Sequence, residues 1–123
     1  MTLEAIVLCL ALNIYYEANS EPLVGKLAVA HVTMNRAEQD EHNVCKVVYA
    51  PGQFSWTKQK NLAKPNKSDL EAAKELAALV ISGETKDPTN GATYFHNTTV
   101  NPRWKTVKKT VQIGNHIFYK KVN

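Results

Sequence analysis

The stretch ALNIYYEANSEPLVGKLAVAHVTMNR, residues 11–36, contains two apolar helical runs separated by a polar break. Glu17 lies at the end of the first run, and Glu21 and Pro22 open the second. Proline suits the first turn of a helix, because the N–H that it lacks would have no partner there. A carboxylate held where two helices meet can be partly desolvated and fixed in direction, as a general acid near neutral pH requires. Glu17 is therefore the first candidate for chemistry.

Apolar residues at helical spacing also precede this stretch, and they predict a first helix that begins near the N-terminus. Thr2 can cap the first helix, and Glu4 in its first turn is favoured by the helix dipole. The buried face of this helix is predicted from apolar residues at the helical period, namely Leu3, Ile6, Val7, Leu10 and Ile14. We expect the second helix to end near residue 36 or 38. Its predicted stripe is Val24, Leu27, Ala28, His31 and Met34.

Two further helices are expected in the middle of the chain. A short one covers residues 44–49, after a polar loop at residues 39–43. A longer one begins at a capping box formed by Ser68 and Glu71 and ends at Gly83. Between them, residues 51–66 form a long irregular stretch, and such stretches in compact domains are often functional.

The last third of the chain is predicted to form strands. Residues 87–91, DPTNG, are typical of a turn, and a short strand at residues 92–96 follows them. Residues 107–113 and 116–122 are predicted to pair as a hairpin around a Gly114-Asn115 turn. Helices followed by strands indicate an α+β fold rather than a parallel α/β sheet. We expect one domain over residues 1–123, with N-terminal helices followed by a small antiparallel sheet.

Composition narrows the class of protein without deciding its function. The 123 residues are 44% hydrophobic and 21% charged, which is ordinary for a globular domain. The net charge of +4 suits an anionic partner. No recognition helix or RNA-binding signature is visible, so no nucleic-acid partner is expected. The four histidines and two cysteines lack zinc-ligand spacing, so neither a metal nor a cofactor is expected.

Cysteine usage and the apolar N-terminal segment bear on the compartment. Cys9 and Cys45 lie in apolar runs without a CxxC motif, which favours two buried free thiols over a disulfide and suits a reducing compartment. Residues 3–16 lack the basic start and cleavage site of a signal peptide. They are also too short to span a membrane. We therefore expect no stable membrane insertion and a chain made in the cytoplasm, released by other means or cut from a longer precursor.

Five blocks together resemble the SleB-type cell wall hydrolases, a family that includes spore-cortex-lytic enzymes and phage lysins. They are NIYYEANSEPLVGKLAVAHVTMNR, VCKVVYAPGQFSW, DPTNGATYFHN, VNPRW and IGNHIFY, in that order along the chain. The resemblance implies a lysozyme-like α+β fold related to lytic transglycosylases. It implies cleavage of the β-1,4 bond between N-acetylmuramic acid and N-acetylglucosamine in peptidoglycan, with Glu17 as the catalytic acid.

One carboxylate is sufficient for this reaction. Ordinary glycosidases need two, one as acid and one as nucleophile or base. A lytic transglycosylase closes a 1,6-anhydro ring with the muramic acid's own 6-hydroxyl, so a single glutamate can serve as acid and then as base. If Glu21 instead activates a water molecule, the enzyme is a hydrolytic muramidase. The sequence leaves this choice open.

The resemblance also suggests residues that bind the sugar. Tyr94 resembles a family tyrosine near the acid, where its hydroxyl would orient Glu17 or an acetamido group. Glu21 is a further candidate in this set. The other candidates are polar hydrogen-bonding residues, Gln53, Ser55, His96 and Asn97, and aromatic residues that can stack on sugar faces, Phe54, Trp56 and Trp104.

The expected biological setting follows from the same resemblance. Without a signal peptide or a wall-binding module, the chain looks more like a monomeric phage endolysin than an exported bacterial enzyme. Such a protein is made in the host cytoplasm and reaches peptidoglycan through holin-dependent release. Two other functions are weighed against this one: a non-catalytic wall-binding domain, which would not need Glu17, and a basic nucleic-acid-binding domain.

Overall fold

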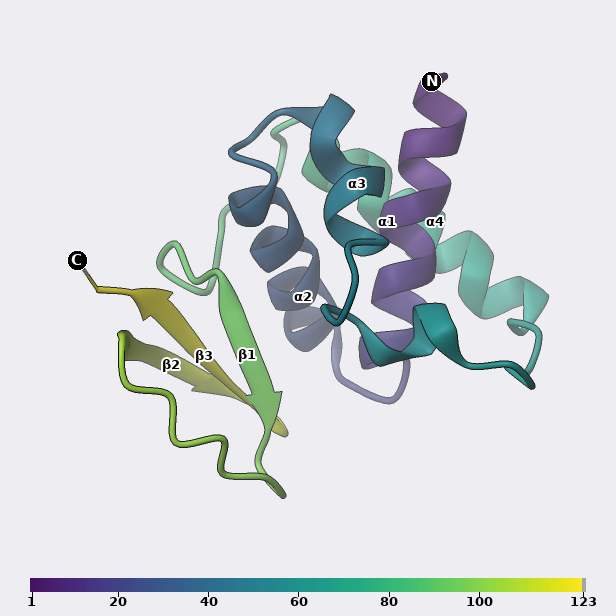
Figure 1. Ribbon diagram of the computed structural model, residues 1–123. Helices are drawn as coiled ribbons and strands as arrows, with labels where there is room; N and C mark the ends of the chain where they lie inside the picture. The colour runs from purple at the N-terminus through teal and green to yellow at the C-terminus, as the bar shows by residue number, and fades with distance from the viewer. Residues whose placement is uncertain (123) are drawn as a thin grey trace.

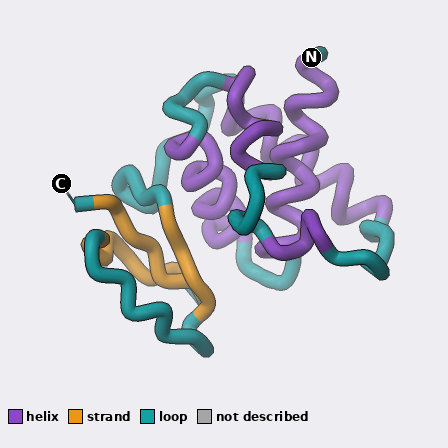
Figure 2. Tube along the Cα trace, viewed as in Figure 1, coloured by secondary structure: helices purple, strands orange, loops and turns teal. Residues whose placement is uncertain are grey.

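The computed structural model describes residues 1–122, and it places four α-helices beside a three-stranded antiparallel sheet (Figure 1, Figure 2). The helical part contains α1 (Leu3–Ala18), α2 (Leu23–Arg36), η1 (Glu41–Asn43), α3 (Val44–Val48), η2 (Ser55–Lys58) and α4 (Lys67–Ile81). The sheet contains β1 (Tyr94–Asn97), β2 (Val107–Ile113) and β3 (His116–Lys121). The predicted α+β order is confirmed.

The first helix begins as its sequence predicts, whereas the second begins at Leu23, just after the predicted Glu21 and Pro22. The Thr2 hydroxyl accepts a hydrogen bond from the Ala5 N–H at 3.1 Å and caps α1. Pro22 occupies the N-cap position of α2. In Figure 1, α2 lies between the sheet and α1, so it is the element that joins the two parts of the fold.

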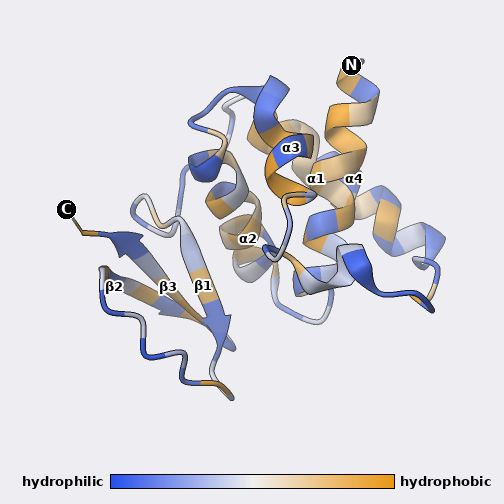
Figure 3. Cartoon of the chain, in the orientation of Figure 1, coloured by the Kyte–Doolittle hydropathy of each residue, from blue (hydrophilic) through white to orange (hydrophobic). Residues whose placement is uncertain are grey.

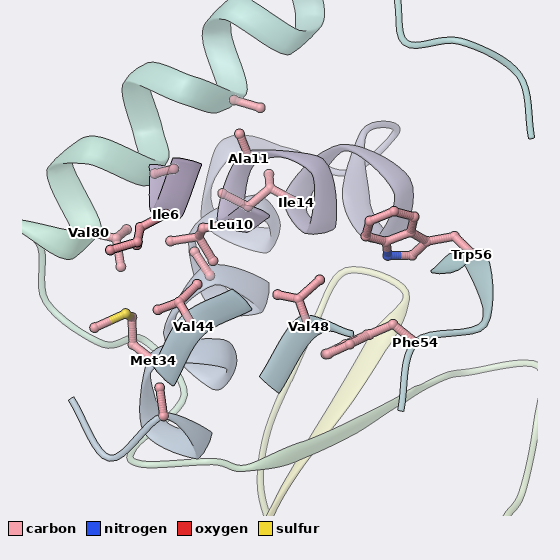
Figure 4. Packing of buried hydrophobic residues seen from close by; sticks show 14 residues of the cluster. Ile6, Leu10, Ala11, Ile14, Met34, Val44, Val48, Phe54, Trp56 and Val80 are labelled. Carbon is pink, nitrogen blue, oxygen red and sulfur yellow. The ribbon is translucent and has the colours of Figure 1, made fainter. Parts of the chain in front are cut away.

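The hydrophobic core forms where α1 meets α2, α3 and α4. Figure 4 shows side chains from these helices converging on Leu10 and Ile14, which are fully buried. Phe54 and Trp56 extend the same cluster from the irregular segment. Figure 3 shows hydrophobic residues concentrated on α1 and α2, whereas the connection between β1 and β2 is largely hydrophilic. Burial of this face supplies most of the stability of the helices.

The sheet has the order β1-β3-β2, with antiparallel pairing throughout. The predicted hairpin forms with Gly114 and Asn115 at its turn. A second small cluster of Ala28, Val32, Ala92 and Phe118 attaches the sheet to α2. The predicted strand at residues 92–96 begins two residues later and ends one residue later, at Tyr94 and Asn97, where the residues pair with β3.

The start of α4 differs from the prediction. The cap is Asn66, whose side-chain oxygen accepts a hydrogen bond from the Asp69 N–H at 3.1 Å. The predicted Ser68 and Glu71 capping box is therefore wrong, since both residues lie inside the helix. Asn66 is an equally suitable cap by residue type, and the position of α4 against α1 decides between the two starts.

The prediction of free thiols is also wrong. Cys9 of α1 and Cys45 of α3 form a disulfide, with their Cα atoms 5.3 Å apart. The packing of α3 on α1 brings together two residues that are 36 positions apart in the sequence, so no local motif marks the pair. Disulfides are typical of oxidising compartments, so the two cysteines do not indicate a reducing compartment.

Within residues 1–122, no helix combines the length and the apolar character needed to cross a membrane.

Candidate active site

A cleft of about 580 Å³ lies between the helical part and the sheet. Its helical side comes from the end of α1, the end of α2 and the loop before η2. Its other side comes from β1, the connection to β2, and β3. The lining residues that the chemistry concerns are Tyr16, Glu17, Arg36, Gln53, Phe54, Tyr94, His96, Asn97, Trp104 and His116.

Glu17 lies on the last turn of α1 with its side chain lining this cleft. Burial raises the pKa of Glu17 to about 7, because the charged form loses hydration. Among residues 1–122, no side chain forms an ion pair with this carboxyl, so nothing offsets that loss. A carboxyl with this pKa holds its proton over a large part of the neutral range, as a general acid must.

Buried polar side chains below Glu17 form hydrogen bonds with one another. The fully buried Asn13, one turn earlier on α1, donates to the Thr33 hydroxyl of α2 at 3.1 Å. Its side-chain oxygen accepts a hydrogen bond from the Trp56 indole N–H at 2.9 Å. This network fixes α1, α2 and η2 relative to one another directly below the cleft.

The sheet side of the cleft is an aromatic cluster. His96 stacks on Tyr119 and shares a 2.8 Å hydrogen bond with its hydroxyl. Trp104 packs edge-on against His96 and Tyr119 and close to Tyr94. Trp104 keeps 41% of its surface exposed, so an aromatic face is available to a ligand. Rings of this kind stack on the apolar faces of sugars.

The structure brings most of the predicted residues together and separates three of them. Glu17, Gln53, Phe54, Tyr94, His96, Asn97 and Trp104 all line the cleft. Ser55 is exposed but lies outside the lining, and Trp56 is 7% exposed, stacked on Tyr16 with ring centroids 4.9 Å apart. Trp56 therefore supports the cleft from the core.

Glu21 is the third predicted residue outside the lining. It was expected at the N-terminus of the second helix, but α2 begins at Leu23 and Glu21 is buried beneath the hairpin turn. Its carboxylate accepts hydrogen bonds from Asn115. His116 lies between Glu21 and the cleft, with its Nδ1 atom 3.9 Å from Glu21 Oε1, and burial lowers its pKa.

Arg36 is a cleft residue that the sequence did not single out. It ends α2, lines the cleft and donates a hydrogen bond to the side-chain oxygen of Gln53. Its guanidinium carbon lies 5.9 Å from the ring centre of Phe54 and 5.6 Å from that of Tyr94. An arginine in the last turn of a helix is common for electrostatic reasons, so its position alone carried no functional signal.

Metal binding has no support from the geometry, since no group of three or more candidate ligands occurs among residues 1–122. The chemistry available in the cleft is that of one carboxyl, one guanidinium, one lysine ammonium, two imidazoles and several aromatic and amide groups.

Comparison with known proteins identifies the family of the chain. Residues 20–119 match the family described as Cell Wall Hydrolase. The chain is 32% identical over 113 residues to the spore cortex-lytic enzyme of Halalkalibacterium halodurans, covering 89% of this chain and 33% of that protein. It is also 32% identical to the spore cortex-lytic enzyme of Bacillus cereus, covering 87% of this chain and 41% of that protein. The chain thus spans well under half the length of these curated relatives.

Two solved structures share the fold. The catalytic domain of the germination-specific lytic transglycosylase SleB from Bacillus anthracis superposes with a TM-score of 0.75 at 29% identity, covering 98% of this chain and 97% of that domain. The catalytic domain of the Bacillus cereus SleB protein gives a TM-score of 0.72 at 32% identity, covering 94% and 89%. The α+β fold is the lysozyme-like fold of these domains.

Proposed function

Because the chain belongs to the cell wall hydrolase family, we propose that it cleaves the β-1,4 bond between N-acetylmuramic acid and N-acetylglucosamine in peptidoglycan. Residues 1–123 act as one catalytic domain in this proposal, with Glu17 as the catalytic residue. The reaction is that of a lytic transglycosylase. Its support from relatives is the activity of the Bacillus anthracis domain, which matches nearly the whole chain.

The observation that carries the proposal is a single carboxyl in the cleft. Glu17 has a pKa of about 7, and the described residues that line the cleft include no second aspartate or glutamate. A two-carboxylate mechanism would need such a partner on the other side of the scissile bond. A mechanism with one acid that later acts as a base does not.

Glu17 alone can carry out both proton transfers of the proposed reaction. The protonated Glu17 carboxyl gives its proton to the glycosidic oxygen, and the bond from that oxygen to C1 of muramic acid breaks. The Glu17 carboxylate then accepts the proton of the 6-hydroxyl as O6 bonds to C1. The product is a 1,6-anhydro sugar, no water is consumed, and Glu17 is protonated again. The intramolecular hydroxyl has the entropic advantage of a tethered nucleophile.

The placement of Glu21 favours this reaction over hydrolysis by the same fold. A muramidase was expected to use Glu21 to activate water, and the Glu21 carboxylate is instead buried and bonded to Asn115. Sugar binding is proposed for the cleft residues Gln53, Phe54, Tyr94, His96, Asn97 and Trp104. A role as a phage endolysin released through a holin stays a prediction from the sequence.

The test is a mass spectrum of purified peptidoglycan after digestion by the wild type and by Glu17→Gln. We expect fragments ending in anhydro-muramic acid, lighter by one water than hydrolytic products, from the wild type only. Hydrated reducing ends would make the protein a muramidase. Absence of glycan cleavage by a folded wild type would indicate a wall-binding domain. Matched circular dichroism spectra of the two proteins would show that the variant is folded.

A further inference from the structure

We propose that Arg36 binds a carboxylate of the substrate, so that the cleft selects glycan strands carrying muramic acid carboxylates or stem-peptide carboxylates over neutral sugar polymers. This inference rests on the proposed function and concerns the same cleft. It names the substrate class that the cleft recognises and the residue that recognises it.

The first observation is that the Arg36 charge is only partly satisfied. The guanidinium has five N–H donors, and the one hydrogen-bond partner of its side chain among residues 1–122 is the neutral amide oxygen of Gln53. No ion pair to Arg36 occurs among the same residues. Partial burial lowers its pKa, but an arginine still keeps its charge at neutral pH. A partly desolvated cation without a counterion favours binding of an anion.

Glu17 is not the missing counterion. No ion pair joins Arg36 to Glu17 among residues 1–122, and burial raises the pKa of Glu17 to about 7, so this carboxyl is only partly charged at neutral pH. The remaining charged residue of the lining, Lys105, has the same sign as Arg36 and is exposed. No residue among 1–122 therefore forms an ion pair with Arg36, and a bound ligand can supply that anion.

The second observation is that the guanidinium is held in place before any ligand arrives. It contacts the ring faces of Phe54 and Tyr94 with centroid distances of 5.9 and 5.6 Å, and it is tied to Gln53. These contacts restrict the planar guanidinium of a residue that lines the cleft, so that less entropy is lost when a ligand binds to it. A fork of this kind recognises a carboxylate through two parallel hydrogen bonds.

Peptidoglycan offers such carboxylates in two places. A strand without stem peptides carries the free lactyl carboxylate of muramic acid, and a strand with stems carries the peptide carboxylates. A polymer of N-acetylglucosamine alone has neither. Arg36 would thus add affinity for muramic acid strands that the aromatic side of the cleft, which contacts any sugar, does not supply.

A structural role is the competing explanation. Arg36 is the basic residue in the last turn of α2, where a cation interacts favourably with the helix dipole. That role would make substitution harmful regardless of the substrate. Measurements on substrates with and without negative charge therefore distinguish a structural role of Arg36 from carboxylate binding.

The experiment compares wild type, Arg36→Gln and Arg36→Lys on soluble strand fragments with stems and on fragments whose stems an amidase has removed. Each fragment is used with free carboxylates and after conversion of the carboxylates to methylamides. We measure kcat/KM for cleavage, and we measure Kd by calorimetry with each protein in a Glu17→Gln background. Lys108→Gln removes one exposed positive charge from β2 outside the cleft and is the matched control.

We expect Arg36→Gln to weaken binding and kcat/KM on free carboxylates about 10- to 100-fold, as loss of a charge-assisted bidentate contact does. Conversion of the fragment carboxylates to methylamides should reduce the affinity and kcat/KM of the wild type to those of Arg36→Gln. The same conversion should leave the affinity and kcat/KM of Arg36→Gln unchanged. Arg36→Lys should recover part of the loss, and Lys108→Gln should change little. The fragment on which the effect occurs, with or without stems, identifies the carboxylate.

Equal losses by Arg36→Gln on free and amidated fragments would overturn the inference. The wild-type comparison alone is decisive if that variant does not fold, because unchanged wild-type binding after amidation would also overturn it. Carboxylate-dependent binding without cleavage by the wild type would instead leave the inference standing and remove the proposed function.

Discussion

The carboxylate of Glu21 accepts two hydrogen bonds from Asn115, which lies 94 residues further along the chain. The backbone N–H of Asn115 donates to Oε1 at 3.0 Å, and its side-chain amide donates to Oε2 at 3.1 Å. This contact joins the start of α2 to the turn of the β2–β3 hairpin. It is thus one of the contacts between the helical part, which carries Glu17, and the sheet, which carries the other side of the cleft.

Loss of this contact should loosen the sheet. We expect Glu21→Ala to lower the free energy of unfolding by about 1–3 kcal/mol, because two hydrogen bonds to a buried charged acceptor are lost. Urea unfolding measures this effect, with the exposed Glu75→Gln of α4 as control. The coupling of Glu21→Gln and Asn115→Ala in a double-mutant cycle isolates the side-chain bond. Additive effects of those two changes would show that the bond contributes nothing.

Glu21→Gln should also reduce glycan cleavage less than Glu17→Gln does. The expected reason is that Glu21 only positions the hairpin, whereas Glu17 transfers the proton. Cleavage rates of both variants, measured at a temperature where both are folded, test this order. Equal loss in the two variants would mean that the carboxylates act as a pair.

Gly114 is required by the same contact. A Cβ atom at this position would lie 2.5 Å from Glu21 Oε1, and the backbone φ is +56°. Gly83 has a φ of +81°, but a Cβ atom there would meet no neighbouring atom within 4 Å, so it reports the backbone cost alone. We expect Gly114→Ala to destabilise the fold by about 1–2 kcal/mol more than Gly83→Ala. Equal destabilisation in thermal melts would contradict the close approach.

Glu17 should make the fold less stable as the pH rises. Its pKa is about 7 in the folded protein and 4.5 ordinarily, so the folded state retains the proton that the unfolded chain releases. The stability that this group contributes is complete below about pH 4.5 and is lost as the pH rises to about 7. We expect Glu17→Gln to be more stable than wild type by about 1–3 kcal/mol at about pH 8 and equal to it near pH 4. Urea unfolding across pH, with Glu75→Gln as control, measures the difference.

The same proton should govern the rate. Since the general acid must be protonated before cleavage, kcat/KM should be level at low pH and decline above about pH 7. Each further pH unit should reduce it roughly tenfold. Rates on soluble strands, with folding checked at every pH, give the profile. A flat profile between about pH 6 and 9 would show that Glu17 does not limit the rate as an acid.

The disulfide should be a major stabilising element. The Cys9–Cys45 bond closes a loop with a sequence separation of 36, for which chain entropy gives about 3–4 kcal/mol. We expect reduction of the wild type to lower the free energy of unfolding by that amount. The double variant Cys9→Ala with Cys45→Ala should be insensitive to reductant. An unchanged urea midpoint on reduction would contradict the prediction.

Local patterns were sufficient for the elements of this fold. Thr2 and Pro22 mark the starts of α1 and α2 because capping depends on neighbouring residues. The β2–β3 hairpin could be predicted because strand alternation and the Gly114-Asn115 turn are short-range signals. Glu17 was identified at its helix junction, and the family resemblance supplied the role now proposed for it.

Packing between elements determined the contacts of residues far apart in sequence. Separate elements are joined by the pairing of Cys9 with Cys45, by the bonding of Glu21 to Asn115 and by the contacts of Arg36 with the rings of Phe54 and Tyr94. Residue type and spacing do not encode such contacts, because they depend on how helices and sheet pack. Local sequence therefore specified most of the helices, the hairpin and the position of Glu17 at the end of α1, whereas packing specified which side chains surround Glu17 and brought Arg36 to the same cleft.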